Sequence, residues 1–399
     1  MKKVAIVLML IMLSFTLTSC WDMTELNKIG IIGAVGIDYD NGQYKLTFEI
    51  NRPRRLGNSK EGDEKKEPAA HIEIEGESLS EALQNAYSVF ERELYWPNIK
   101  VYLLTEKAAK RGILTIFEFL ERYPEPRLNV PVLITKNASI SEIFNVKGNI
   151  EGTTSEYINS LLQGIQYNSK GVNVTLLDYM FVKPQSGREG TVGVIERIQK
   201  KPIILGTQKT DGINSYMLKL EGTGIFVNNY LKGFLNGNET RVLNYVNGKI
   251  KEDTITVKGP DDNNVITSVH VYNSNCKKEV SINGNDVNIN LKIDLKAMQI
   301  LEHTGKLKIL DTKNIGKIEK LMSEKVKTEV KETIKRVQSE LNSDIFGFGE
   351  SVYFRNPKEW ESLKENWNEL FSKCKVNVEV KTQITRHGTI DEPIKHKEN

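Results

Sequence analysis

The sequence lacks the residue patterns that most metalloproteins and hydrolases need. There is no close histidine pair and no His-Glu-x-x-His motif to bind zinc, because the five histidines are scattered at positions 71, 270, 303, 387 and 396. There is neither a Gly-x-x-x-x-Gly-Lys-Ser/Thr loop to cradle phosphates nor a Gly-x-Ser-x-Gly turn to present a nucleophilic serine. We therefore expect no metal site, no cofactor and no catalytic residue set.

Strong net charge and long apolar runs are also missing. The formal net charge is +3 at pH 7 and falls to about +1 without Lys2 and Lys3, and the other lysine runs are short and lie among acidic or neutral residues. The sequence therefore predicts no nucleic-acid partner. Beyond the N-terminus no apolar run approaches the ~20 residues that a membrane-spanning helix needs. A charged fraction of 27% and a mean hydropathy of −0.39 indicate a water-soluble body.

The first residues are typical of a lipoprotein signal peptide. Lys2 and Lys3 precede an apolar run at residues 4–13, which is too short for a comfortable membrane span, and residues 14–19 are smaller and more polar. Directly behind this run, Leu17-Thr18-Ser19-Cys20 fits the lipobox, in which the cysteine thiol takes a diacylglyceryl group. We predict that residues 1–19 are removed and that Cys20 carries lipid.

Of the three cysteines, Cys20 is the predicted lipid anchor, and the other two can be bridged or free. Two acyl chains on Cys20 give stable membrane anchoring, whereas one chain gives only reversible binding. The alternative is an ordinary secretory peptide with a chance cysteine at its boundary. Cys276 and Cys374 form one disulfide or remain two buried thiols, and we favour free thiols.

A mature chain of about 380 residues exceeds one typical domain, so we predict at least two. The N-terminal domain, residues 20–200, mixes strands with helices. Residues 29–38 and 44–51 pair around a turn, and the charged, proline-containing segment 52–70 is a mobile loop. Strands and helices then alternate, with strands at 71–75, 99–105, 130–135 and 190–198 and helices at 79–94, 107–122, 155–166 and 174–181.

A polar boundary segment, residues 201–215, precedes a C-terminal α+β domain at 216–387, and residues 388–399 form a disordered tail. The C-terminal domain begins with a hairpin, 223–227 and 231–235, and a helix capped at Asn238-Glu239. Alternating polar and apolar residues then predict an antiparallel sheet with strands at 254–258, 265–272, 278–282 and 287–295.

The strongest helix signal lies near the C-terminus. Apolar residues recur every three or four positions from Ile315 to Leu341, with lysine and glutamate between them. This amphipathic helix packs its apolar stripe on the preceding sheet or, as the alternative, keeps it for a partner protein. A further helix carries Trp360 and Trp367, and a last strand follows at 376–384. We expect a mixed α/β (α+β) fold of two to three successive domains, with mostly antiparallel sheets packed against helices.

Three stretches, in this order and spacing, carry a resemblance to a known family. They are Cys20-Trp21-Asp22 with Glu25-Leu26 and Gly36-Ile37-Asp38; Gly222-Thr223-Gly224-Ile225-Phe226 with Leu231-Lys232-Gly233-Phe234-Leu235 and Glu239-Thr240-Arg241; and Asp344-Ile345-Phe346-Gly347-Phe348-Gly349 with Pro357-Lys358-Glu359-Trp360 and Trp367. In them the chain resembles the Ger(x)C lipoproteins, the C subunits of the nutrient germinant receptors of bacterial spores.

The resemblance implies a lipid-anchored, non-catalytic subunit on the outer face of the spore inner membrane. It implies two integral membrane partners, the A-type and B-type subunits, and a role in germination triggered by nutrients. It also implies a mixed α/β fold of about three domains, and it assigns no germinant-binding residues to this subunit. The alternative is a lipid-anchored solute-binding protein or envelope hydrolase that shares only the export signal.

Two aromatic residues in the last stretch are a candidate docking loop for a partner subunit. Phe346 and Phe348 are flanked by glycines in a polar neighbourhood, and exposed aromatic residues often anchor protein partners. Core packing at a helix end is the other interpretation, and we favour it.

Overall fold

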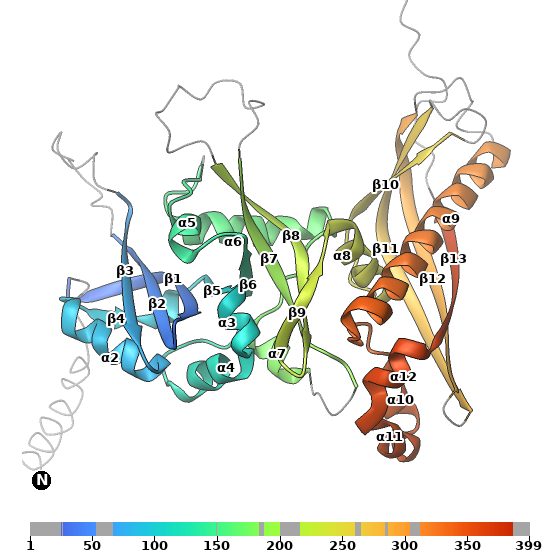
Figure 1. Cartoon of the computed structure of the whole chain (residues 1–399). Coiled ribbons are helices and arrows are strands. Elements are labelled where there is room, and N and C mark those ends of the chain that lie inside the picture. The colour runs from blue at the N-terminus through green and yellow to red at the C-terminus, as the bar shows by residue number, and fades with distance from the viewer. Residues whose placement is uncertain are drawn as a thin grey trace, which may run out of the picture.

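The predicted mixed α/β class is confirmed. A computed structural model describes residues 25, 27–52, 67–148, 150–182, 187–199, 216–259, 265–283, 286–303 and 312–385. Within these residues the chain forms two β-sheets, of nine and four strands, flanked by helices (Figure 1). Cys20 with the predicted signal peptide, most of segment 52–70, the boundary 201–215 and the tail 388–399 lie outside the described residues.

The first sheet begins with a meander of three antiparallel strands. β1 (Ile29–Asp40) and β2 (Gln43–Asn51) pair as predicted, and β3 (Ala69–Gly76) pairs with β2. The β1–β2 turn places Asn41 and Gly42 at φ values of 51° and 85°, a left-handed region that these residue types adopt readily. β1 is largely buried, whereas β3 alternates between exposed and partly buried side chains.

The centre of the first sheet is parallel, so the expectation of mostly antiparallel sheets holds only at its two sides. β5 (Val101–Thr105), β6 (Val132–Lys136) and β7 (Thr191–Gln199) follow β1 in parallel pairs, and the short β4 (Glu93–Tyr95) pairs with the start of β1. Helices cover both faces of this centre, so its strands are apolar on both sides and show no alternation.

The helices of this region are α2 (Leu79–Val89), α3 (Glu106–Arg111), α4 (Ile113–Arg122), α5 (Ile140–Phe144), α6 (Thr154–Gly164) and α7 (Leu176–Phe181), with 3₁₀ turns at Trp96–Asn98 and Ile165–Tyr167. α2 begins at the predicted residue, Leu79, where Ser78 Oγ caps the helix by accepting the N–H of Glu81, but it ends earlier than predicted. The predicted helix at 107–122 is broken at Gly112, whose φ of 124° is incompatible with a continuous helix.

The first sheet continues across the predicted domain boundary. β8 (Tyr216–Val227) pairs with β7 and β9 (Tyr230–Leu235) pairs with β8, both antiparallel, so the hairpin predicted to open the C-terminal domain completes the N-terminal sheet. Helix α8 (Gly237–Val246) follows. Its N-cap is Asn236, two residues before the predicted one, and Glu239 closes the capping box.

The second sheet contains β10 (Asp253–Lys258), β11 (Ile266–Asn283), β12 (Asp286–His303) and β13 (Lys375–Ile384), in that order. β11 and β12 form one long antiparallel hairpin, where the sequence predicted two shorter strands for the first arm. The last strand, β13, is parallel to β12 because intervening helices carry the chain back along the sheet.

The long helix predicted near the C-terminus is α9 (Thr312–Arg336), which continues through a π-helical turn at Val337–Leu341. Its apolar stripe is buried against the second sheet, where Ser323 Oγ donates a 3.0 Å hydrogen bond to Thr382 Oγ1. The prediction that this stripe belongs to the core is confirmed. Three short helices, with a 3₁₀ turn at Lys364–Asn366, precede β13: α10 (Phe348–Arg355), α11 (Pro357–Leu363) and α12 (Trp367–Lys373).

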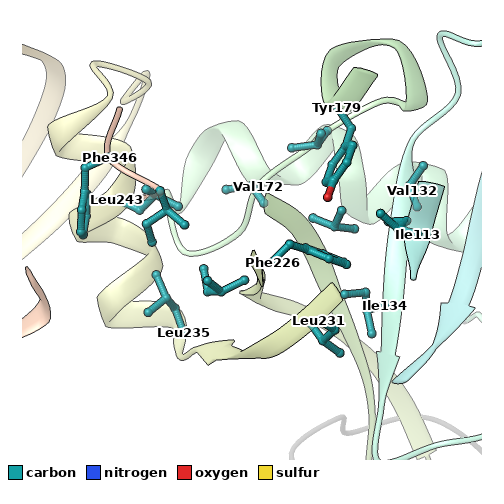
Figure 2. Packing of buried hydrophobic residues seen from close by; sticks show 14 of the residues in the cluster. Ile113, Val132, Ile134, Val172, Tyr179, Phe226, Leu231, Leu235, Leu243 and Phe346 are labelled. Carbon is teal, nitrogen blue, oxygen red and sulfur yellow. The ribbon is translucent and has the colours of Figure 1, made fainter. Parts of the chain in front are cut away.

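One hydrophobic cluster runs through both sheets. Figure 2 shows Phe226, Leu231 and Leu235 of the β8–β9 hairpin between Ile134 of β6 and Leu243 of α8, with Phe346 beyond Leu243. A second cluster lies on the other face of the first sheet, beneath α5 and α6. In the described part of the chain, no helix is long and apolar enough to cross a membrane.

Candidate functional site

The two aromatic rings offered by the sequence as a docking loop are buried. Phe346 and Phe348 are 0% exposed, and their rings stack with a centroid distance of 5.5 Å. Both rings therefore pack in the core, which is the interpretation that the sequence favoured over a docking loop. Cys20, the other predicted site residue, lies outside the described residues.

Asp344, two residues before Phe346, is a fully buried carboxylate held by three donors. Its Oδ2 accepts the N–H of Gly349 at 2.7 Å and the indole N–H of Trp367 at 3.0 Å. Its Oδ1 accepts the N–H of Phe348 at 3.2 Å. Burial raises the pKa of the Asp344 carboxyl above its ordinary value, and these hydrogen bonds limit the rise. The carboxylate therefore fixes the start of α10 and the position of α12.

Two further ionisable side chains lie around Asp344. Lys278 of β11 donates to the carbonyl of Phe346 and, at 3.0 Å, to Asn247 Oδ1, and burial lowers the pKa of Lys278. The backbone N–H of Glu189 donates to the carbonyl of Asp344 at 3.0 Å, and burial raises the pKa of the Glu189 carboxyl. Lys278 comes from the second sheet and Glu189 lies two residues before β7, so the short segment from Asp344 to Phe346 is bonded to chain segments of both sheets.

Hydrogen bonds here join segments about a hundred residues apart. Ser343 Oγ donates to the carbonyl of Phe226 at 2.7 Å. Arg336 of α9 donates two bonds of 2.7 Å to the Glu239 carboxylate. The middle and last stretches that carry the family resemblance therefore meet in space. We name this place the junction, and it consists of Glu189, Phe226, Lys278, Ser343, Asp344 and Trp367.

The junction requires glycine at two positions. A Cβ on Gly349 would lie 2.6 Å from Trp367 Nε1 and 2.8 Å from the carbonyl oxygen of Gly187. Gly187 itself has a φ of +73°, and Trp360 would lie 2.1 Å from its Cβ. The glycines of Gly347-Phe348-Gly349 thus serve a turn and close packing.

A second buried group ties α8 to the second sheet. Arg241 Nη2 pairs with Glu329 Oε2 of α9 at 2.8 Å, and Arg241 Nε lies 3.9 Å from Asp253 Oδ2. The Tyr245 hydroxyl donates to the same Asp253 carboxylate, and burial raises the pKa of Tyr245 well above its ordinary value. The resemblance singled out Arg241, but no pattern in the sequence indicated its partners.

Sequence reasoning also missed a cavity of about 530 Å³ between β3, α5 and the start of α6. The Glu49 side chain, 1% exposed, accepts the N–H groups of Thr154 and Ser155 at 3.1 and 2.8 Å. His71 Nε2 lies 3.5 Å from Glu49 Oε2, and the His71 ring stacks on Phe144. Burial acts to raise the pKa of Glu49, but hydrogen bonds from His71 and Ser155 hold it below its ordinary value.

Charged pairs also line the mouth of this cavity. The Arg197 guanidinium lies 3.6 Å from the centroid of the Tyr216 ring and 2.6 Å from Glu142 Oε1. Lys147 pairs with Glu67 at 2.8 Å. The cavity therefore offers both positive and negative groups to a small polar molecule. Glu49 and His71 are direct neighbours across the β2–β3 pair, so recognising that strand pairing is the signal that would have found them.

The described residues contain no group of three or more His, Cys, Asp and Glu side chains placed to hold a metal ion. Cys276 and Cys374 are free thiols, as the sequence favoured, and burial raises their pKa values to about 11 and about 12. Both remain protonated and weakly nucleophilic near neutral pH. Chemically, the arrangement is suited to holding two sheets together and to accommodating a small polar solute.

Comparison with known proteins gives two family matches, one in the N-terminal half of the chain and one in the C-terminal half. Residues 22–197 match the family model of the spore germination protein N-terminal domain, and residues 221–388 match the C-terminal model described as spore germination B3/GerAC like. Spore germination protein KC of Bacillus subtilis (strain 168) is 25% identical over 406 residues, covering 99% of this chain and 98% of that protein. Spore germination protein B3 of the same organism is 23% identical over 382 residues, covering 94% and 95%.

A solved structure shares the fold. The crystal structure of the GerBC protein superimposes with a TM-score of 0.53 and covers 88% of this chain and 96% of that chain. The two sequences are 18% identical, so the likeness concerns the fold alone.

Proposed function

Because the chain belongs to the GerAC-like family of spore germination proteins and is the C subunit of a nutrient germinant receptor, we propose that lipid on Cys20 holds it beside integral membrane partners. The single observation that carries the proposed place beside membrane partners is the match of both family models, in order, over residues 22–197 and 221–388. The proposed partners are the A-type and B-type receptor subunits, and the proposed location is the outer face of the spore inner membrane.

The lipid anchor is supported by the order of residues at the N-terminus. A basic pair, a short apolar run and Leu17-Thr18-Ser19-Cys20 follow one another without interruption. Two acyl chains on one cysteine are sufficient for stable membrane binding, so such an anchor needs no membrane-spanning helix.

A non-catalytic role is supported by the state of the ionisable groups. Asp344 is fully buried and satisfied by three donors, and Cys276 and Cys374 are protonated thiols near neutral pH. The junction joins the two sheets through buried hydrogen bonds instead of presenting a reactive group to solvent. We propose that the subunit acts through its surfaces, which the junction keeps in a fixed arrangement.

The anchor is tested by Cys20→Ala in sporulating cells. We expect the variant to leave the membrane fraction and nutrient-triggered germination to fall, because the body then diffuses away from its partners. Cys276→Ala is the matched control, since it removes a thiol from the folded body and should leave membrane retention unchanged. Normal membrane binding and normal germination in Cys20→Ala would overturn the anchored-subunit proposal.

Solute binding is a second candidate function, favoured by the cavity beside Glu49 and His71. Calorimetric titration of the full chain in detergent with amino acids and sugars tests it. Micromolar binding that His71→Ala abolishes, and that a change at the exposed Phe354 of α10 leaves intact, would support this function. Turnover of a cortex fragment would instead indicate an envelope hydrolase. If no solute binds, the solute-binding function is ruled out and the receptor-subunit role stands by itself.

A further inference from the structure

Large exposed apolar side chains are concentrated on one layer of the molecule. α2, α4 and α7 pack their buried residues into the same hydrophobic cluster, on one face of the first sheet. These helices, the adjoining β4 and the β8–β9 turn occupy the lower part of the first sheet in Figure 1. We name their exposed apolar residues the apolar face, and they are Tyr87, Val89, Tyr95, Leu114, Leu177, Phe181 and Tyr230.

The elements that carry the apolar face are bonded to one another. The hydroxyl groups of Tyr87 in α2 and Tyr123 at the end of α4 lie 3.2 Å apart. At the other end of α4, the N–H of Ile113 donates to the carbonyl of Asn229 in the β8–β9 turn at 3.0 Å. The Tyr179 hydroxyl of α7 donates to the side chain of the same Asn229 at 3.3 Å. The elements that carry the apolar face are therefore held in a fixed arrangement relative to one another.

The exposure of this face is large for apolar side chains. Phe181 is 70% exposed, Val89 65% and Tyr230 56%. Four of the seven residues are aromatic and three of these are tyrosines, which place an apolar ring and a polar hydroxyl at the same position. They are spread singly over the helix layer and do not converge on one pocket. This composition suits the interfacial region of a bilayer, where tyrosine and phenylalanine rings are stabilised at the boundary between hydrocarbon and water.

The chain also enters the fold beside this face. The N–H of Glu93 in β4 donates to the carbonyl of Lys28 at 3.0 Å, and Tyr87 lines a depression together with Asn27 and Lys28. Cys20 precedes Asn27 by seven residues, which span at most about 25 Å when fully extended. Lipid on Cys20 would thus keep the start of β1 and the adjoining end of α2 within that distance of the bilayer.

We propose that the apolar face lies on the lipid bilayer, with its tyrosine and phenylalanine rings in the interfacial region of the membrane that the anchor enters. This inference rests on the proposed lipid anchor and adds the orientation of the body. A lipid on a short tether fixes distance but not orientation, whereas the anchor and the apolar face together define which side of the first sheet faces the membrane.

Depth-dependent quenching tests the proposal with the full lipidated chain. Single cysteines at Val89, Leu114 and Phe181, in a Cys276→Ser/Cys374→Ala background, carry an environment-sensitive fluorophore. The protein is reconstituted in vesicles of phosphatidylcholine and phosphatidylglycerol. Spin-labelled lipids serve as the quencher. The matched control positions are Ile150 and Tyr167, which flank α6 on the opposite face of the first sheet and are 94% and 63% exposed.

We expect lipid-borne quenchers to reduce fluorescence at the three test positions at least about twofold more than at the two controls. Equal quenching at all five positions overturns the assigned orientation. Failure of the protein to remain on vesicles overturns the lipid anchor instead, so the two failures are distinguishable. Shielding of the three positions that arises only when the integral membrane subunits are present would assign the face to a protein partner and overturn the bilayer as its occupant.

Discussion

Trp367 Nε1 donates a 3.0 Å hydrogen bond to the buried Asp344 Oδ2, and this bond ties α12 to the segment that precedes α10. The backbone carbonyl of the same Asp344 accepts the N–H of Glu189, next to the first sheet. Asp344 therefore links the C-terminal helices to the first sheet, and the Phe346 carbonyl, two residues later, accepts a hydrogen bond from Lys278 of the second sheet. A subunit that acts through its surfaces needs such a link, because surfaces on two sheets keep a fixed relation only if the sheets move together.

Replacement of Asp344 tests this link. In Asp344→Asn one carboxylate oxygen becomes an NH₂ group, which faces N–H donors and leaves at least one of them without an acceptor. We expect the free energy of unfolding to fall by about 2 kcal/mol, measured by urea denaturation. Asp294→Asn, on an exposed position of β12, is the matched control and should change stability by less than about 0.5 kcal/mol. Equal losses in the two variants would contradict the role of Asp344.

Close packing at Gly349 predicts a second loss of stability. A methyl group in Gly349→Ala would lie 2.6 Å from Trp367 Nε1, so the indole or the backbone of Gly187 must shift. We expect destabilisation by about 2 kcal/mol, seen as a lower urea midpoint. Gly316→Ala in α9 provides the opposite control. Its Cβ meets nothing within 4 Å, so this variant should gain about 0.5–1 kcal/mol from helix propensity. If Gly349→Ala is as stable as the parent, the residues around Gly349 can shift without a loss of stability, and the close packing is not required.

Local patterns in the sequence were sufficient to predict individual elements. The apolar stripe from Ile315 to Leu341, the start of a helix at Leu79 and the β1–β2 turn all appear where the sequence placed them. Each depends on residues a few positions apart, and such short-range signals are visible without a structure.

Pairings between distant residues could not be read in the same way. The β8–β9 hairpin was predicted correctly, but its place beside β7 depends on pairing between two strands that residues 200–215 separate in the sequence. The parallel centre of the first sheet carries no alternation that identifies its neighbours. Asp344 looked like part of a polar segment around two phenylalanines, whereas its burial depends on Gly349 and on Trp367, 23 residues away.

Stability at acidic pH is expected to depend on Glu49. The folded-state pKa of Glu49 lies below its ordinary value of 4.5, so ionised Glu49 stabilises the fold above about pH 4.5. This contribution is lost as the pH falls through the lower folded-state pKa. We expect Glu49→Gln to be less stable than the parent by about 1–3 kcal/mol at pH 7, because charge-assisted bonds are lost. The difference should shrink as the pH falls below about 4.5.

Urea denaturation of both proteins from pH 7 to pH 3.5 measures this difference. The two proteins must be compared at each pH because Asp344 and Glu189 have raised pKa values, so their effect on the change of folding stability with pH has the opposite sign. Glu93→Gln, at an exposed position, is the control and should follow the parent throughout. A Glu49→Gln deficit that stays constant down to the lowest pH would contradict the role of the ionised carboxylate.

Thiol titration tests the folded body and the anchor together. Burial raises the pKa values of Cys276 and Cys374 to about 11 and about 12, so a thiol reagent at neutral pH should modify both slowly in the folded protein. After unfolding in guanidinium, protein extracted from the membrane should yield two reactive thiols, since the Cys20 sulfur is held in a thioether to diacylglycerol. Unprocessed precursor should yield three under the same conditions, because the sequence contains three cysteines. Three thiols in the membrane-extracted protein would show that Cys20 carries no lipid, and fewer than two would show that Cys276 and Cys374 are bridged or oxidised.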